Sequence, residues 1–245
     1  MLSDDILYEV HNDKKVKKLI DEIYLKADSF LIGNKYSVES SRLIGQYLSE
    51  AIPEINLIER ESVCKALLRG EHEQVNKLLA MIQKQSDTKL GLKLNAVKPA
   101  ANFDRINQIA VSMMDETVPI ETIQRRARNG VENVARSFYD RFIQVNAESR
   151  KKIGIQGYIV RIAAPDCCSW CTAIAGRYAY GEEPDGIYRR HDKCNCTVTY
   201  ENGRERQNVW TKEKWTMPLQ TTTIGTKLTD SEIQAIQSKK SLKVG

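Results

Sequence analysis

Residues 167–200 read CCSWCTAIAGRYAYGEEPDGIYRRHDKCNCTVTY, and this segment decides the fold of the C-terminal part of the chain. The window 167–196 contains five of the six cysteines and one of the three histidines. Thiolate and imidazole are the ligands that a tetrahedral zinc ion selects. A Cys-x2-Cys pair, followed about twenty residues later by His-x2-Cys-x-Cys, has the spacing of a two-knuckle zinc site. We therefore expect a structural metal site here.

The window offers more ligands than one tetrahedral ion needs. Cys168 and Cys171 form the better first knuckle, because the two residues between them let both sulfurs face one ion, and Cys167 is then surplus. Two ligands are needed from the second knuckle, and the spacing leaves open which residue is omitted. If that stretch is extended, Cys194 and Cys196 point to one face. The candidate zinc ligands are Cys168, Cys171, His191, Cys194 and Cys196.

Disulfide and redox chemistry are the alternatives to zinc. The stretch Met1–Lys14 is mixed and charged rather than an apolar signal run, which favours a reduced, intracellular environment over disulfide formation. A redox Cys-x2-Cys would begin a helix in a thioredoxin-like βαβ context, which the surrounding residues do not indicate.

The segments around the cysteines predict a small α/β module. Residues 172–175 suit a short helical turn that ends at Gly176. Residues 158–162, 178–180 and 197–200 are typical of short strands. Such a module has little core of its own. It would depend on its ion, since zinc binding contributes on the order of 10 kcal/mol or more to folding in comparable small domains.

The upstream chain predicts a helical array. Of the 245 residues, 41% are hydrophobic, which suffices for one sizeable domain or two small ones. We expect a helix over 16–30 that stops near Gly33-Asn34, a second over 38–52 capped by Ser37, and helical segments over 57–82 interrupted at Gly70. Residues 84–102 read as a loop, and another helix follows from Ile106.

A basic helix is predicted after Pro119. Its apolar stripe recurs every three or four residues and comprises Ile120, Ile123, Ala127, Val131, Val134, Phe138 and Phe142. Residues 121–161 hold nine basic and four acidic side chains, so this stretch accounts for the whole net charge of +5. The basic side chains could meet nucleic-acid phosphate, an acidic protein ring or only solvent. The candidate binding residues are Arg125, Arg126, Arg128, Arg136, Lys151 and Lys152.

The cysteine region resembles a known family. The matching residues are Cys167-Cys168-Ser169-Trp170-Cys171, Ala175-Gly176 with Tyr178 and Tyr180, Arg189-Arg190-His191, Cys194-x-Cys196 and Thr197–Tyr200. This pattern is similar to the C-terminal signature of phage minor head proteins, the Mu F-like head morphogenesis proteins of tailed phages. The resemblance implies a low-copy virion component near the portal, present in the host cytoplasm during assembly. Its implied partners are the portal, the major capsid protein and viral double-stranded DNA.

The sequence thus predicts an α+β protein with a mainly α-helical N-terminal domain (1–153), a small zinc-stabilised α/β module (154–203) and a polar tail (204–245). The expected function is head morphogenesis and DNA packaging or ejection, through structural and DNA-backbone contacts rather than enzymatic activity. The alternative is a zinc-supported nuclease or toxin-like domain with His191 as general base and Arg189 or Arg190 on a phosphate. That alternative conflicts with so many soft ligands, because catalytic zinc keeps a position for water.

Three smaller expectations complete the sequence picture. Cys64 is expected to be a core thiol, and His11 and His72 are expected to have no catalytic role. In the tail, Trp210 and Trp215 suit an anchor for a partner surface, which we favour, or packing back on the zinc module, and a last helix is expected over 233–236. No run approaches the roughly 18 apolar residues of a membrane span, so no membrane contact is expected.

Overall fold

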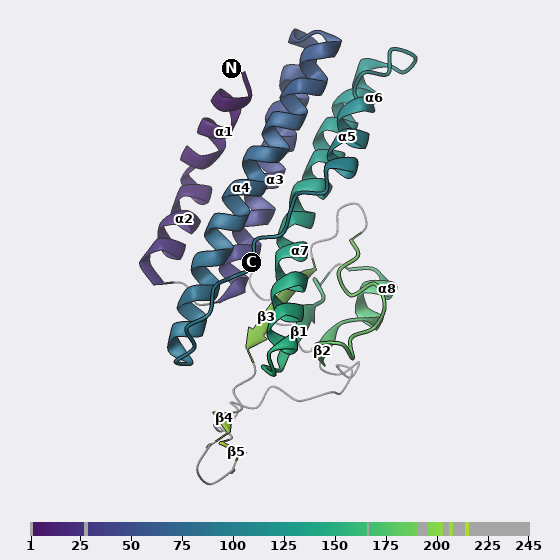
Figure 1. Ribbon diagram of the computed structural model, residues 1–245. Helices are drawn as coiled ribbons and strands as arrows, with labels where there is room; N and C mark the ends of the chain where they lie inside the picture. The colour runs from purple at the N-terminus through teal and green to yellow at the C-terminus, as the bar shows by residue number, and fades with distance from the viewer. Residues whose placement is uncertain are drawn as a thin grey trace, which may run out of the picture. The chain divides into compact units, whose positions relative to one another are not determined.

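The computed structural model describes residues 2–26, 29–165, 167–190, 196–202, 206–207 and 214–215. The chain is α+β, mainly helical with a small three-stranded antiparallel sheet (Figure 1). It divides into two compact units, residues 1–146 and 147–245, which we call the helical unit and the C-terminal unit. Each is described by itself.

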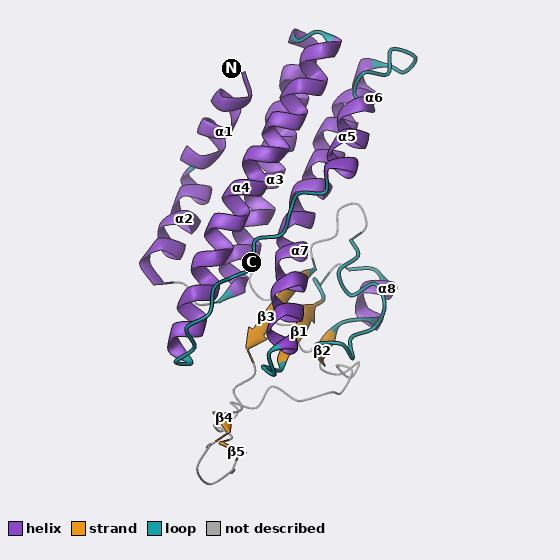
Figure 2. Cartoon of the chain, in the orientation of Figure 1, coloured by secondary structure: helices purple, strands orange, loops and turns teal. Residues whose placement is uncertain are grey.

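Long helices build the helical unit (Figure 2). They are α1 (Leu2–Asn12), α2 (Lys14–Lys26), α3 (Phe30–Ala51), α4 (Leu57–Lys89), α5 (Phe103–Val111), α6 (Ile120–Arg125) and the first part of α7 (Val131–Lys152). A 3-10 turn, η1 (Ile52–Glu54), follows α3, and a π-helical turn, η2 (Arg126–Gly130), joins α6 to α7. Helix α3 packs against α2, α4 and η2, while α1 packs against α3 and α4. Leucine, isoleucine and valine side chains from these helices form the core.

The prediction that a helix ends near Gly33-Asn34 is wrong, because both residues lie inside α3. It begins after Ser29, whose hydroxyl accepts a hydrogen bond from the Leu31 amide (3.3 Å), and it runs unbroken to Ala51. Gly33 faces the side chains of Leu79 and Ile82 on α4 so closely that a Cβ atom would collide with them. The glycine therefore permits close helix packing rather than ending a helix. Ser37 is buried inside α3 and is not a cap.

Helix α4 is likewise a single helix where an interruption at Gly70 was expected. Asn56 and Glu59 form a capping box at its start, with a hydrogen bond of 3.0 Å in each direction. The Leu7 side chain of α1 occupies the space beside Gly70. The helix continues to Lys89, so the connection predicted over 84–102 begins six residues late, at residue 90.

The predicted apolar stripe of the basic helix is confirmed, although α6, η2 and α7 share it. Six of its seven members, Ile123, Ala127, Val131, Val134, Phe138 and Phe142, are buried, and Ile120 is half-buried. A π-helical turn adds a residue to one turn and shifts the facing side chains. The backbone of Arg128 in this turn lies directly against Gly45 of α3.

A buried carboxylate joins α1, α3 and α4. Glu71 is fully buried and accepts hydrogen bonds from the hydroxyls of Ser40 (2.6 Å) and Tyr36 (3.2 Å), and its carboxylate lies 3.8 Å from Nε2 of His11. Burial, and then the nearby Glu71 charge, raise the pKa of Tyr36 well above its ordinary value. Tyr36 therefore keeps its proton and remains a donor to Glu71.

The C-terminal unit confirms the three predicted strands. Strand β1 (Gly157–Ile162) lies between β2 (Gly176–Ala179) and β3 (Thr197–Asn202), and both pairs are antiparallel. The short helix α8 (Ser169–Ala173) lies between β1 and β2 in the chain. Strands β4 (Arg206–Gln207) and β5 (Lys214–Trp215) form a separate antiparallel pair. Trp210 and the helix expected over 233–236 lie outside the described residues, and the docking role expected for Trp210 and Trp215 stays a prediction.

Among the described residues, no helix combines the length and apolar character that crossing a membrane requires.

Candidate metal centre

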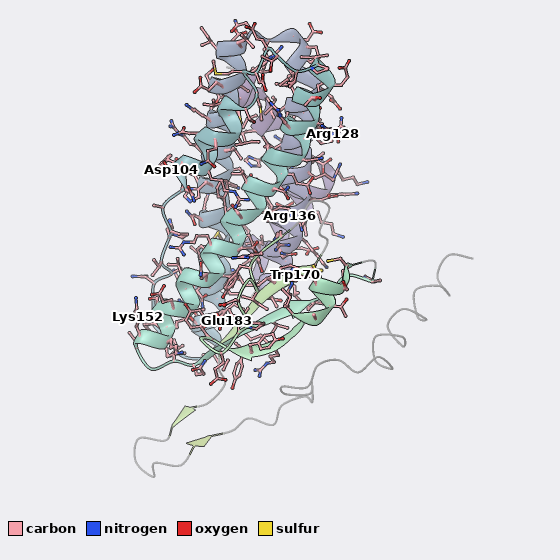
Figure 3. All side chains as sticks on the ribbon, turned by 90° about the vertical axis from the view of Figure 1, so that its right-hand side faces the viewer. Asp104, Arg128, Arg136, Lys152, Trp170 and Glu183 are labelled. Atoms are coloured by element: carbon pink, nitrogen blue, oxygen red, sulfur yellow. The ribbon has the colours of Figure 1, made fainter. Side chains whose placement is uncertain are left out.

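The first predicted knuckle is organised by helix α8. Cys168 is the N-cap of this helix, and its sulfur accepts a hydrogen bond from the Cys171 amide (3.5 Å). One turn of helix then buries Cys171 completely and leaves Trp170 partly exposed; Figure 3 labels Trp170 on α8. The Cys-x2-Cys spacing thus buries its second sulfur while its first is held at the start of the helix.

Two cysteines from distant parts of the sequence are buried together. Cys171 on α8 and Cys196, directly before β3, belong to one buried cluster. Ala164 and Cys167 pack against this cluster from the segment after β1. Folding therefore brings residues of the first and second predicted knuckles into one place, as a shared metal ion would require.

Each of the three described candidate sulfurs receives an N–H donor. The Arg161 guanidinium donates to Sγ of Cys171 (3.4 Å), the Ala164 amide donates to Sγ of Cys196 (3.4 Å), and the third donor is the Cys171 amide already described. Donors of this kind stabilise the negative charge of a thiolate and orient metal ligands. The sulfur environment therefore suits thiolate ligands.

Arg161 connects the parts of this site. Its side chain is almost fully buried on the central strand β1. Besides Cys171, it donates hydrogen bonds to the carbonyls of Ile187 and Arg189 (3.1 Å to the latter). Its guanidinium carbon lies 5.3 Å from the centre of the Trp170 ring. One side chain thus links β1, α8 and the segment that precedes the second knuckle.

The remaining predicted ligands, His191 and Cys194, lie outside the described residues. Within the parts of the chain that the structure describes, no three cysteine, histidine or acidic side chains are grouped as a metal would need. The two buried sulfurs and their N–H donors fit half of a tetrahedral thiolate shell. The complete ligand set stays a prediction.

Cys167 has a role that the spacing did not indicate. It was expected to be surplus, yet it packs on the buried sulfur pair, and its sulfur lies 3.2 Å from the Thr172 hydroxyl. Cys168, the preferred ligand, is exposed. The adjacent cysteines thus offer two alternative first ligands: the spacing favours Cys168, whereas the packing places Cys167 against the buried sulfurs.

The predicted basic surface is smaller than expected. Arg136, labelled on α7 in Figure 3, is buried, so its predicted role as an exposed binding residue is wrong; Arg150, further along the same helix, is buried as well. Arg136 lies 3.5 Å from Glu132. An arginine side chain can be buried when its aliphatic part packs against apolar groups and its guanidinium finds polar partners. Neither residue is placed to meet a phosphate at the surface.

The three predicted arginines of α6 and η2 differ in their exposure and in their partners. Arg125 and Arg128 are exposed, and Arg128 donates to the Ser49 hydroxyl (3.4 Å). Arg126 pairs with Asp115 (3.1 Å) and donates to the Ser112 carbonyl (2.8 Å). Hydrogen bonds from Thr117, and then from Arg126, lower the pKa of Asp115. The exposed cationic surface of this helix is therefore centred on Arg125 and Arg128.

In the C-terminal unit, the two lysines at the end of α7 already have partners. Lys151 donates to the Tyr180 carbonyl (2.8 Å) and lies over the ring of the same residue. Lys152 pairs with Glu148 (2.7 Å) but is largely exposed. Lys152 is thus the more accessible of the pair.

Cys64 is confirmed as a core thiol. It is fully buried in α4, and burial raises its pKa to about 12. His72 packs edge-on against Phe138 with ring centres 5.0 Å apart.

Comparison of the chain with protein-family models, curated proteins and solved structures finds no match.

Proposed function

We propose that this chain is a minor head protein of a tailed phage, whose C-terminal unit is a small module held together by a structural zinc ion. The joint burial of Cys171 and Cys196, with an N–H donor on each sulfur, is the observation that carries the zinc part. The phage role is supported by the residue pattern of the cysteine region and its resemblance to Mu F-like head morphogenesis proteins.

The proposed ion acts as a cross-link. It joins α8 to the segment that enters β3, using Cys171 and Cys196 together with one of the adjacent cysteines Cys167 and Cys168 and a ligand from His191 or Cys194. Three strands of four to six residues bury little apolar surface, so a cross-link adds stability that the core does not supply. Bound zinc would provide folding free energy here rather than a reactive water.

Metal content tests this proposal directly. Protein purified without a metal-binding tag is expected to contain about one zinc per chain and to lose the melting transition of its C-terminal unit on chelation. Cys171→Ser and Cys196→Ser should each lose the metal. Cys64→Ser is the matched control, because this cysteine is a buried thiol of the helical unit. Zinc-free wild-type protein, or full zinc retention in Cys171→Ser, would refute the metal module.

The exposed Arg125 and Arg128 are the residues we propose for DNA-backbone or portal contact. The phosphate backbone attracts arginine without regard to sequence, and such binding weakens steeply with salt. We expect Arg125→Glu with Arg128→Glu to weaken DNA binding in low salt, whereas Lys84→Glu with Lys93→Glu, at exposed lysines outside the candidate set, changes it less. Salt-independent or unchanged binding would exclude the DNA contact. Copurification with the portal in the absence of DNA affinity would then favour an assembly role alone.

The structural role is favoured over a nuclease because the guanidinium of Arg190, one of the two candidate phosphate ligands, makes a structural contact. Arg190, a candidate phosphate ligand, donates to the Cys196 carbonyl (2.6 Å), and the Arg189 carbonyl accepts from Arg161. Both contacts hold the segment in place. Cleavage of DNA or RNA by the zinc-loaded protein, abolished in a folded His191→Ala variant, would reverse this preference.

A further inference from the structure

We propose that the connection between α4 and α5 binds a partner protein by strand addition, and that the partner contributes an extended segment of alternating acidic and apolar residues. This inference concerns the helical unit and is independent of the proposed zinc module. It starts from residues 92–98, which we call the extended segment. Figure 2 shows this segment as an extended loop that belongs to no helix or strand.

The extended segment has the side-chain alternation of a β-strand. Its half-buried side chains are Leu92, Leu94 and Ala96, and the exposed side chains between and after them are Lys93, Asn95 and Val97. Successive side chains point to opposite faces when the backbone is extended. The side-chain amide of Asn146 on α7 accepts a hydrogen bond from the Val97 N–H (2.9 Å) and donates one to the Val97 carbonyl (2.7 Å). Asn146 thus makes the two hydrogen bonds that a residue of a neighbouring strand would make.

Hydrogen bonds hold both ends of the extended segment. At its start, the Leu92 N–H donates to the Asp87 carbonyl (2.8 Å). At its end, next to the Val97 pair, the buried Asn76 side chain donates to the carbonyl of Pro99 (3.1 Å). A segment that is already held in its bound conformation loses less conformational entropy on binding than a flexible loop does. The extended segment is therefore preorganised for a partner.

Between these anchors, the backbone of residues 93–96 makes no hydrogen bond within the described part of the chain. The N–H and C=O groups of alternate residues lie on the same side of an extended chain. Because those of Val97 face Asn146, those of Asn95 face the same side, and those of Leu94 and Ala96 face the opposite side. The edge away from Asn146 therefore presents the backbone groups of Leu94 and Ala96, and such an edge is a template for another strand.

Charge indicates which kind of strand this edge accepts. The exposed charged side chains of residues 84–98 are all lysines, namely Lys84, Lys89, Lys93 and Lys98. The one acidic residue of this stretch, Asp87, is buried. Opposite charges on neighbouring strands attract and like charges repel, so the exposed face favours acidic neighbours and disfavours a second copy of the same segment. The half-buried face, with its leucines and alanine, favours apolar neighbours. The matching strand therefore alternates between acidic and apolar residues.

A synthetic peptide provides the probe. It has about eight residues, a typical strand length, in which glutamate and valine alternate, and both of its ends are blocked. Its binding to the full-length protein is measured by fluorescence anisotropy. Ala96→Pro removes one N–H from the proposed edge, and the matched control Asn95→Pro removes one from the opposite side. Lys93→Glu with Lys98→Glu reverses the charge of the exposed face.

We expect Ala96→Pro to bind the peptide at least about tenfold more weakly than wild type, a change of about 1.4 kcal/mol. The double lysine variant should lose at least as much, because the glutamates then face negative charge. Asn95→Pro should stay within about threefold of wild type. A peptide with lysine in place of glutamate should bind none of these proteins more tightly than wild type binds the acidic peptide.

Other results would overturn the proposal. Failure of the wild-type protein to bind the peptide would exclude an acidic strand as the occupant. Equal affinities of Ala96→Pro and Asn95→Pro would show attraction by charge without backbone pairing, and nucleic acid would then suit the lysines as well as a peptide does. If Ala96→Pro does not fold, two N-methylated peptides decide. Methylation of every glutamate nitrogen removes the donors of one peptide edge, and methylation of every valine nitrogen removes those of the other. Strand addition requires that wild-type protein distinguish these two peptides by at least about tenfold, and equal affinities would refute it.

Discussion

Substitution of Gly45 by alanine should destabilise the helical unit, although alanine is the better helix former. A Cβ at this position would lie closer than 3.0 Å to the carbonyl oxygen of Arg128, and at 3.2 Å and 3.3 Å from its carbonyl carbon and Cα. All three atoms are backbone, so the whole π-helical turn η2 must move away from α3. Overpacking against a rigid neighbour costs about 1–3 kcal/mol.

Gly70→Ala is the matched comparison. It has the same helix-propensity gain of about 1 kcal/mol in the middle of a long helix, but its new methyl group meets the end of the flexible Leu7 side chain. We expect Gly70→Ala to be near neutral or slightly stabilising, and Gly45→Ala to be destabilising by up to about 2 kcal/mol after the propensity gain is subtracted.

Urea denaturation followed by helical circular dichroism measures both variants, and the expected difference is a lower midpoint for Gly45→Ala at an unchanged slope. Equal stabilities would show that η2 does not pack against α3 as described. Because η2 carries Arg128, a displaced turn should also weaken any DNA or partner contact made by that residue, while Gly70→Ala leaves it intact.

Three further predictions concern the helical unit. Glu71→Ala should lower the free energy of unfolding by about 2–5 kcal/mol, because the buried hydroxyls of Tyr36 and Ser40 lose their acceptor. Glu71→Gln keeps an acceptor oxygen and should cost less. Equal losses for the two variants in urea titrations would contradict this reasoning. Burial raises the Cys64 pKa from 9.0 to about 12. The contribution of the protonated Cys64 thiol to the free energy of unfolding is therefore complete below pH 9 and declines as the pH rises toward 12. Wild-type stability should thus fall more steeply than that of Cys64→Ala, by about 1.4 kcal/mol per pH unit, and parallel curves would exclude an effect of the thiol. Asn56→Ala should lower stability by about 1 kcal/mol through loss of the α4 capping box, and a Tm equal to wild type would argue against that cap.

The sequence alone determined the elements whose signals are local. The apolar stripe from Ile123 to Phe142 has a helical period and is buried, and the three β-branched and aromatic segments form β1, β2 and β3. Periodicity and strand propensity are properties of neighbouring residues, so they can be read without the fold. The cysteine spacing likewise singled out two segments, and a residue of each, Cys171 and Cys196, shares one buried cluster.

Tertiary structure alone decided how the glycines, arginines and alternative cysteines are used. Gly33 and Gly70 read as helix ends or breaks, but they lie within α3 and α4. Side chains of other helices occupy the space beside them, which explains why these two positions lack a side chain. The charge of Arg136 suggested an exposed surface, yet in the folded protein its side chain is buried. Cys167 and Cys168 are adjacent, and only the position of the buried sulfurs distinguishes them. The use of each of these residues depends on tertiary packing, which local sequence propensity does not report.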